Sequence, residues 1–164
     1  MVIQQTTKAP RTKSVNGTGY GVHEDLSAAT QSFIADAWQA VDFTGLTLNE
    51  ALSKLPVNSQ SGFIDKVTGA FLFPALGDAY SLKFDAKTTT VTGTSVTFGY
   101  GYDLATIVQE HKTIIPELTA ERWSVEKNVI ITDNTTPLKL FLKFSENVDL
   151  SEIKIIVTKN QENV

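Results

Sequence analysis

The sequence predicts a β-rich domain, arranged as a sandwich or jelly-roll-like pair of sheets, with two or three short helices and an extended N-terminal arm. Threonine, which favours strands, occurs 21 times among the 164 residues. After residue 63, short apolar or alternating runs are separated by turn residues. Before it, two stretches have helical spacing. An open antiparallel sheet with helices on one face is the alternative architecture.

Residues 1–22 form the predicted arm, because they contain few large apolar side chains and no sustained hydrophobic period. Such a segment would not fold alone. Its charged side chains give it +3, whereas the rest of the chain carries −7. We expect the arm to dock onto a partner through its cations and glycines, which are Lys8, Arg11, Lys13, Gly17, Gly19 and Gly21.

The three alternating glycines of this arm do not complete a phosphate-binding motif. In a G-x-G-x-x-G motif the third glycine would occupy the position of Val22, and "RTKSVN" before the glycines is no buried strand. Glu24 and Asp25 follow where a phosphate loop would need Lys and Ser or Thr. We interpret the glycines as a flexible bend, or as a place where the chain lies close to another backbone.

Residues 23–62 are predicted to be a helical segment. Asp25 has the position of an N-cap for a first helix. Thr47 and Glu50 match a T-x-x-E capping box for a second helix, which Pro56 would end. The apolar face of the first helix would consist of Leu26, Ala29, Phe33, Ala37 and Val41.

Residues 63–164 are predicted to be the β-rich domain. "GAFLFPAL", "AYSLKFD" and "TTTVTGTSVTFGYGY" read as early strands, and residues 104–112 as either a helix capped by Asp103 or a buried strand. "RWSVEKNVIIT", "PLKLFLKFS" and "EIKIIVTK" read as three further strands. One face of the middle strand would carry Leu138, Leu140, Leu142 and Phe144.

Catalytic signatures are missing from the sequence. The absence of cysteine excludes disulfides, thiolate metal sites and a cysteine nucleophile. No G-x-S-x-G motif occurs, and the two histidines, His23 and His111, have no second ligand at helical spacing. We therefore expect a non-enzymatic protein without a cofactor or a metal. A small enzyme whose site is assembled from distant residues is the third alternative.

Four aromatic residues are candidates for an interface or a ligand site. Tyr100 and Tyr102, in "GYGYD", could pack on opposite faces of a turn or form a platform for stacking sugars. Trp38 and Trp123 could pack in the core or, if exposed, anchor an interface. These residues support the second function hypothesis, a carbohydrate- or surface-binding adhesion module.

Charge and hydropathy restrict the partners. Three cations are too few for strong binding to nucleic acid. No apolar run approaches membrane-spanning length, and "MVIQQTTKAPRTKSV" has no signal-peptide core. We expect a soluble protein that is made in the cytoplasm and is not inserted into a membrane.

Taken together, the cysteine-free, Thr/Asn-rich and β-rich sequence with its extended arm resembles bacteriophage virion structural proteins. The resemblance implies a capsid-decorating, head-fibre, or tail and neck component of the virion. Such a protein would act through self-association as a homo-oligomer and through docking of its arm on other virion proteins. A second, local stretch, "TPLKLFLKFSENVDLSEIKIIV", is similar to the strand-FSE-VD stretch of bacterial immunoglobulin-like domains and implies strand–turn–strand.

Overall fold

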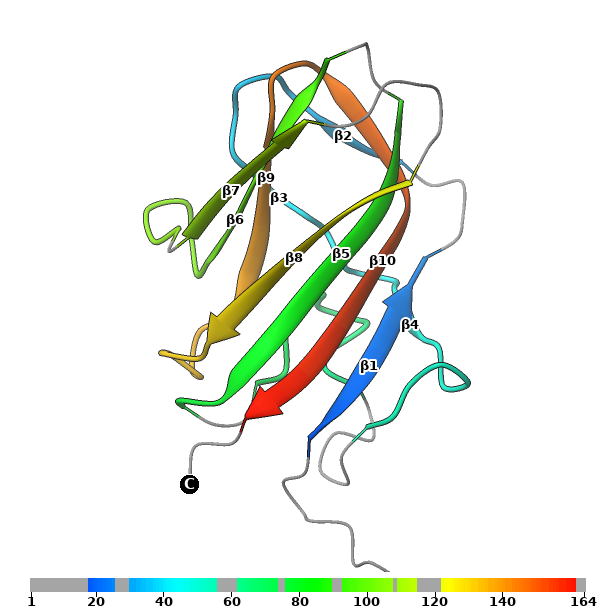
Figure 1. The fold of residues 1–164 in the computed structure, drawn as a ribbon, viewed down its shortest axis with the longest axis vertical. Coiled ribbons are helices and arrows are strands. Elements are labelled where there is room, and N and C mark those ends of the chain that lie inside the picture. The colour runs from blue at the N-terminus through cyan, green and yellow to red at the C-terminus, as the bar shows by residue number, and fades with distance from the viewer. Residues whose placement is uncertain are drawn as a thin grey trace, which may run out of the picture.

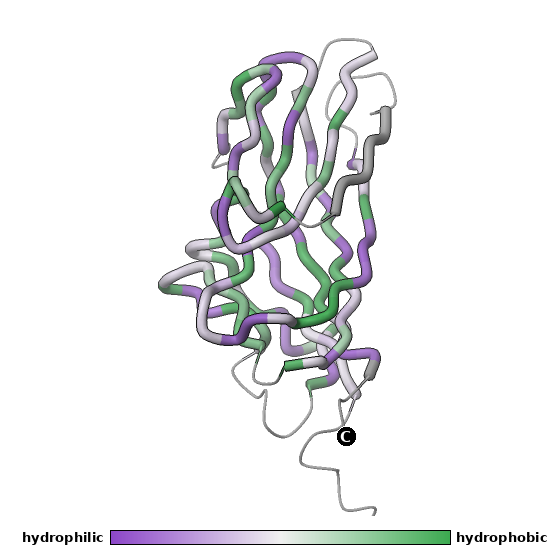
Figure 2. Tube along the Cα trace, turned by 90° about the vertical axis from the view of Figure 1, so that its left-hand side faces the viewer, coloured by the Kyte–Doolittle hydropathy of each residue, from purple (hydrophilic) through white to green (hydrophobic). Residues whose placement is uncertain are grey.

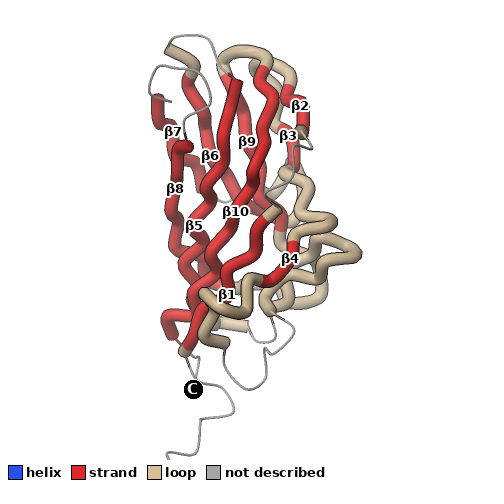
Figure 3. The backbone as a smooth tube through the Cα atoms, turned by 90° about the vertical axis from the view of Figure 1, so that its right-hand side faces the viewer, coloured by secondary structure: helices blue, strands red, loops and turns tan. Residues whose placement is uncertain are grey.

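Two antiparallel β-sheets face each other in the computed structural model of the chain (Figure 1, Figure 3). The structure describes residues 18–25, 30–55, 62–73, 76–89, 93–107, 109–114 and 122–161. Within these ranges every regular element is a strand, and none is a helix. The predicted β-rich class is therefore confirmed, and the predicted helices are wrong.

The larger sheet has the strand order β4-β1-β10-β5-β8, and β2 also pairs with β10. Its strands are β1 (Gly19–Glu24), β2 (Gln31–Phe33), β4 (Thr47–Leu48), β5 (Ala79–Thr89), β8 (Arg122–Ile130) and β10 (Val148–Gln161). The smaller sheet has the order β3-β9-β6-β7. Its strands are β3 (Gln39–Ala40), β6 (Ser95–Gly101), β7 (Gln109–Ile114) and β9 (Lys139–Phe144). The last three predicted strands thus correspond to β8, β9 and β10.

The strand pairs are nested along the chain. β6 pairs with β7, β5 with β8, β3 with β9 and β1 with β10, and these pairs alternate between the two sheets. A long antiparallel hairpin that is rolled up on itself has this connectivity, which is that of a double-sheet jelly roll. Since every pair is antiparallel, both sheets can bury one face and solvate the other.

The core lies between the two sheets, where alternate side chains of the strands meet. Leu140, Leu142 and Phe144 of β9 are buried as predicted, because side chains in a strand alternate between faces. The Phe144 ring lies 5.4 Å from Phe33 and 6.2 Å from Trp123, both of which come from the opposite sheet. Figure 2 shows hydrophobic and hydrophilic residues interspersed along the strands.

One charged pair is buried inside the sandwich. Lys159 near the end of β10 points inward, and its Nζ lies 3.0 Å from Oδ2 of Asp78. The Tyr80 hydroxyl donates to the same carboxylate at 3.3 Å. A buried charge without a partner is costly, so removing either charge alone would destabilise the fold.

A β-bulge interrupts β10 between Ser151 and Lys154, where the register to β5 shifts. Glu152, within the bulge, has φ of 49°, a left-handed conformation that is unfavourable for a residue with a side chain. Its carboxylate accepts from Lys87 at 2.5 Å and from Arg122 at 3.0 Å. The hydrogen bond from Lys87, followed by the charges of both cations, lowers the pKa of Glu152.

The predicted first helix is replaced by two short strands that cross from one sheet to the other. β2 pairs with β10 in the larger sheet, and β3 pairs with β9 in the smaller sheet. The Gln31 side chain bonds both backbone groups of Asp42, at 2.5 and 3.0 Å. Phe33 and Val41 are eight residues apart and would share a helix face, but here both are buried from extended segments. Tertiary pairing has overridden the helical period.

The predicted second helix and one predicted strand are also wrong. Thr47 lies in β4, and its hydroxyl donates to the Glu24 carbonyl at 3.3 Å. Asn49 instead begins a single turn, because its side-chain oxygen accepts from the Leu52 N–H at 3.2 Å. In "GAFLFPAL" the described residues 69–73 form a loop with one isolated bridge, between Phe71 and Ile64. Of the segment predicted as a helix or a buried strand, residues 109–114 form strand β7, whereas residues 104 and 105 lie in a turn.

We predict that Leu140→Asp will destabilise the domain by several kcal/mol, because it buries an unpaired charge between the sheets. Thermal melts followed by circular dichroism measure the effect. Ile130→Asp is the matched control, because Ile130 on β8 is exposed and its substitution should change stability by less than about 1 kcal/mol. A native melt for Leu140→Asp would show that this face is not the core.

Candidate functional site: a groove beside β4

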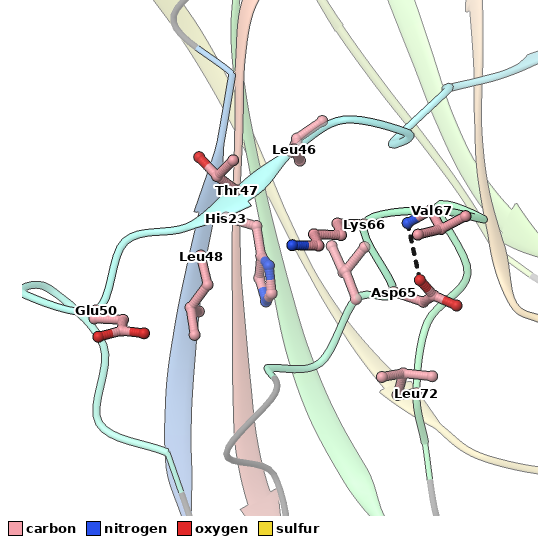
Figure 4. Close-up of a pocket in the computed structure, with 10 residues that line it drawn as sticks. His23, Leu46, Thr47, Leu48, Glu50, Asp65, Lys66, Val67 and Leu72 are labelled. Atoms are coloured by element: carbon pink, nitrogen blue, oxygen red, sulfur yellow. Dashed lines mark hydrogen bonds between the residues drawn. The ribbon is translucent and has the colours of Figure 1, made fainter.

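A groove of about 590 Å³ opens beside the short strand β4 (Figure 4). One wall comes from Leu46, Thr47 and Leu48, and the other from the loop that follows Gly62. Five of the ten lining side chains are apolar, and the others are polar or charged. The lining residues are His23, Leu46, Thr47, Leu48, Glu50, Ile64, Asp65, Lys66, Val67 and Leu72.

His23 lies between the two walls, and its side chain is 1% exposed. It belongs to β1, where it is paired with Leu48 of β4 and Ile155 of β10. The Phe63 N–H donates to Nε2 at 3.2 Å, so the proton of the neutral ring is on Nδ1. Burial lowers the pKa of His23 to about 4. The imidazole is therefore neutral at pH 7 and serves as a hydrogen-bond acceptor.

Two glycines let the chain pack closely around this imidazole. A Cβ on Gly62 would lie 2.5 Å from Cε1 of His23, and the φ of Gly62 is +91°. A Cβ on Gly21 would lie 3.1 Å from Nε2 of the same ring. Gly19 and Gly21 are strand residues of β1, so their interpretation as a flexible bend is wrong. The other interpretation is close approach to another backbone, but the atoms nearest to a Cβ at Gly21 belong to the side chains of His23, Leu55 and Phe63.

The outer wall is held by a turn around Asp65. Its carboxylate accepts from the Val67 N–H at 2.8 Å, and its carbonyl accepts from the Gly69 N–H at 2.7 Å. The same hydrogen bond from Val67, followed by one from Thr68, lowers the pKa of Asp65. The Gly45 N–H donates to the Lys66 carbonyl at 2.9 Å and joins the two walls. The turn presents Val67 outward, where it is 75% exposed.

The predicted aromatic candidates lie elsewhere. Tyr100 is buried in the core, and Tyr102 packs against the same core, so the expected placement on opposite faces is wrong. The Tyr102 hydroxyl accepts from the Asp133 N–H at 2.8 Å and donates to the Asp133 carbonyl at 3.1 Å. Trp123 is buried, and its Nε1 has no hydrogen-bond partner among the described residues. Trp38 is half-buried beneath Lys143, whose Nζ lies 5.1 Å from the ring centroid.

The predicted arm is described only from residue 18 onward. Gly19 to Val22 belong to β1 and thus to the sandwich itself. Four predicted docking residues, Lys8, Arg11, Lys13 and Gly17, lie outside the described residues, as does the side chain of His111. In the described ranges, no group of three or more His, Asp or Glu side chains could hold a metal ion. The same ranges contain no helix long and apolar enough to cross a membrane.

From the sequence, His23 is considered only as a metal ligand, a role that is excluded, and the groove is not predicted. The signal for the outer wall was "FIDKVTG", in which an Asp is followed by a Thr and a Gly, a composition typical of turns. Pairing of His23 with Leu48 could not be expected, because the intervening segment was predicted to be helical.

No family model matches the chain, and no curated protein matches it in sequence. Its fold is similar to that of vertex protein P5 of phage PRD1, with a TM-score of 0.57 and 13% identity over 89% of this chain and 100% of that one. Eiger TNF from S. frugiperda gives 0.48 at 8% identity over 91% and 96%. A chain of Broad Bean Stain Virus gives 0.36 at 10% identity over 99% and 91%. At 13% identity, the similarity to P5 shows a shared fold and nothing more.

We predict that the free energy of unfolding will decrease as the pH falls from about 6.5 to about 4. In this window the unfolded chain protonates His23 and the folded chain does not, so the folded state loses stability. The loss attributable to this group is at most about 3 kcal/mol. Urea unfolding across this window measures it. A His23→Gln variant should have a flatter profile, while the control His111→Gln keeps His23 and its slope; equal slopes for both variants would contradict the assignment.

We predict that Gly62→Ala will destabilise the protein more than Gly45→Ala. Both glycines have positive φ, +91° and +82°, so both substitutions carry a conformational cost of about 1 kcal/mol. A Cβ at Gly45 meets no atom of the described residues within 4 Å, whereas at Gly62 it collides with His23. The collision should add about 1 to 3 kcal/mol. Denaturant midpoints compare the two variants, and equal losses would mean that His23 is not packed against Gly62.

Proposed function

We propose that the chain is a non-enzymatic structural component of a phage virion, a capsid or head accessory or a tail or neck protein. It acts through self-association and docking of its N-terminal arm. The observation that carries the proposal is the jelly-roll connectivity, together with the likeness of the fold to P5 over all of that chain. P5 is a vertex protein of phage PRD1. Because fold alone does not specify function, the proposal also depends on features of this chain.

The charge distribution supports docking of the arm. Residues 1–17 carry +3, and the remaining residues carry −7. Opposite charges on two parts of one chain favour contact between copies and accelerate their encounter. The groove beside β4 offers an apolar surface for such a contact.

The carbohydrate-binding alternative has less support. Tyr100 is buried in the core, where it cannot stack on a sugar. The hydroxyl of Tyr102 is engaged with Thr132 and Asp133, so it holds two loops together. Trp38 is half-buried and directly precedes β3 of the smaller sheet, and it does not line the groove.

We predict that deleting residues 2–16 will abolish self-association and incorporation into particles while changing the melting temperature little. The deletion ends before β1, so the sandwich keeps every strand of its described part. Mass photometry, thermal melts and co-sedimentation with virus particles test both parts. A chain in which residues 2–16 are replaced by a Gly/Ser segment of equal length is the control for length.

Two outcomes would contradict this prediction. If the truncated chain assembles and incorporates normally, the arm is not the docking element. If it instead unfolds at a much lower temperature, residues 2–16 belong to the folded domain. A full-length chain that is monomeric at all accessible concentrations would overturn the proposed self-association itself.

A further inference from the structure

We infer that the groove beside β4 binds residues 2–16 of a second copy of this chain. The inference rests on the proposed function, because it identifies the surface and the partner of the proposed self-association. Four properties of the groove and the chain lead to it: the exposed apolar lip, the charge of the rim, the outer edge of β4 and the blocked edge of β1.

The lip of the groove is apolar and exposed. Val67 is 75% exposed and Leu72 is 41% exposed, and both line the same cavity as the more buried Leu46 and Ile64. Contiguous apolar surface that opens into a concave site is typical of binding surfaces. Val67 is fixed at this position by the turn around Asp65 and cannot withdraw into the core without breaking that turn.

The rim of the groove complements the N-terminal residues in charge and hydropathy. Glu50 and Asp65 contribute two negative charges to the lining, against one positive charge from Lys66. Residues 2–16 contain cations but no anion, and they begin with Val2 and Ile3. The apolar pair fits the cavity, and the cations that follow fit an acidic rim. Fifteen extended residues span up to about 50 Å, which is enough to reach a neighbouring copy.

β4 offers backbone groups to an added segment. It is the terminal strand of the larger sheet within the described ranges, since β1 occupies its other side. A strand at the end of a sheet has backbone donors and acceptors directed outward, and extended peptides bind such edges. Backbone pairing would compensate part of the entropy lost when residues 2–16 become ordered.

The segment of the same copy is poorly placed to use this site. It precedes Gly19, which lies at the opposite end of β1 from His23 and Glu24, the residues that pair with β4. A return along the edge of β1 would require the segment to reverse direction. That side of β1 is already occupied, because Tyr20 and Lys54 exchange backbone hydrogen bonds of 2.6 and 2.8 Å. Thr47 and Leu48 cover the same edge further along β1. Within the described part of the chain, no strand pairs with the outer side of β4, where a segment from another copy would bind.

Engineered cysteines test the inference directly, because the natural chain contains none. One chain carries Ile3→Cys, and a second, distinguishable by mass, carries Val67→Cys. Mixing them under mild oxidation should give a disulfide-linked heterodimer as the main product. Leu104→Cys is the matched control for Val67→Cys, because Leu104 is 60% exposed but does not line the groove, and it should give little product.

A second variant tests the energetic contribution of the lip. Val67→Asp should weaken self-association at least ~10-fold by mass photometry, because it places a charge in an apolar contact. Its melting temperature should stay close to that of the natural chain, since Val67 is exposed. Leu104→Asp, a substitution at another exposed apolar residue outside the groove, should leave association unchanged.

The outcomes separate the inference from the proposed function. Assembly that persists in mass photometry without the heterodimer, or with Val67→Asp behaving as Leu104→Asp does, overturns the inference and leaves the proposed function standing. A disulfide that forms only within a doubly substituted chain, Ile3→Cys with Val67→Cys, also overturns it, because the segment then binds its own copy. Absence of any assembly overturns both.

Discussion

Strand β10 is paired on both of its sides, and this pairing joins the two halves of the larger sheet. β5 runs along one side of this 14-residue strand, and β1 and β2 pair with the other. The first described strand, β1, and the last, β10, are thus neighbours. The larger sheet can therefore form completely only when segments from both ends of the described chain come together. Such long-range pairing is slow to form, because loop-closure entropy is lost before the contacts stabilise the fold.

Two polar features fix the register of β10. Lys159 points inward to Asp78 near one end, and the bulge at Glu152 is tied to β5 and β8 through Lys87 and Arg122. A slip of one residue would turn Lys159 to the outer face and leave Asp78 buried without its cation. The polar contacts therefore select one register, while the apolar face supplies most of the stabilisation.

The groove follows from how β1 is covered. β10 protects one side of β1 with a full strand, but the other side meets only the two residues of β4 and the turn up to Lys54 within the described ranges. The loop of residues 62–73 then packs over His23 and leaves a cavity where a longer strand would have filled the space. An incomplete sheet edge is a weakness in an isolated protein, and it becomes useful where a partner completes it.

The spacing of hydrophobic residues predicted the secondary structure correctly where it fitted a strand alone. It was misleading where it fitted both a helix and a strand. In β9 and the residue before it, Leu138, Leu140, Leu142 and Phe144 alternate with other residues, and the structure buries all four. Phe33 and Val41 satisfy the helical period, but short extended segments on different sheets bury both. The long-range pairing of β2 with β10 and of β3 with β9 determines the extended conformation, and no local pattern encodes that pairing.

The candidate site was harder to predict than the fold for a related reason. From the sequence, His23 is considered as a single residue. Its neighbours in the groove come from three separate segments, at residues 46–50, 64–67 and 72. The strand pairing that brings them together is long-range. The turn around Asp65 has a recognisable composition, yet its position beside β1 depends on long-range hydrogen bonds, from the Phe63 N–H to His23 and from the Gly45 N–H to the Lys66 carbonyl. The turn composition around Asp65 could be recognised in the sequence, whereas the placement of the three segments beside His23 could not.

A contact between the N-terminal residues of one copy and the groove of the next has a consequence for symmetry. Donor and acceptor surfaces are then different parts of the chain, so the contact is heterologous. Heterologous contacts close into a ring when the rotation between neighbours permits, and otherwise continue as a filament. In a closed ring every groove is filled and every N-terminal segment is bound, so each copy makes two contacts. When one of them breaks, the copy is still held by its second contact. Each contact can then be weak while the assembly is stable, because the second attachment is effectively intramolecular. This chain supplies both surfaces of such a contact. Its basic N-terminal segment is the donor, and the groove beside the short edge strand β4 is the acceptor.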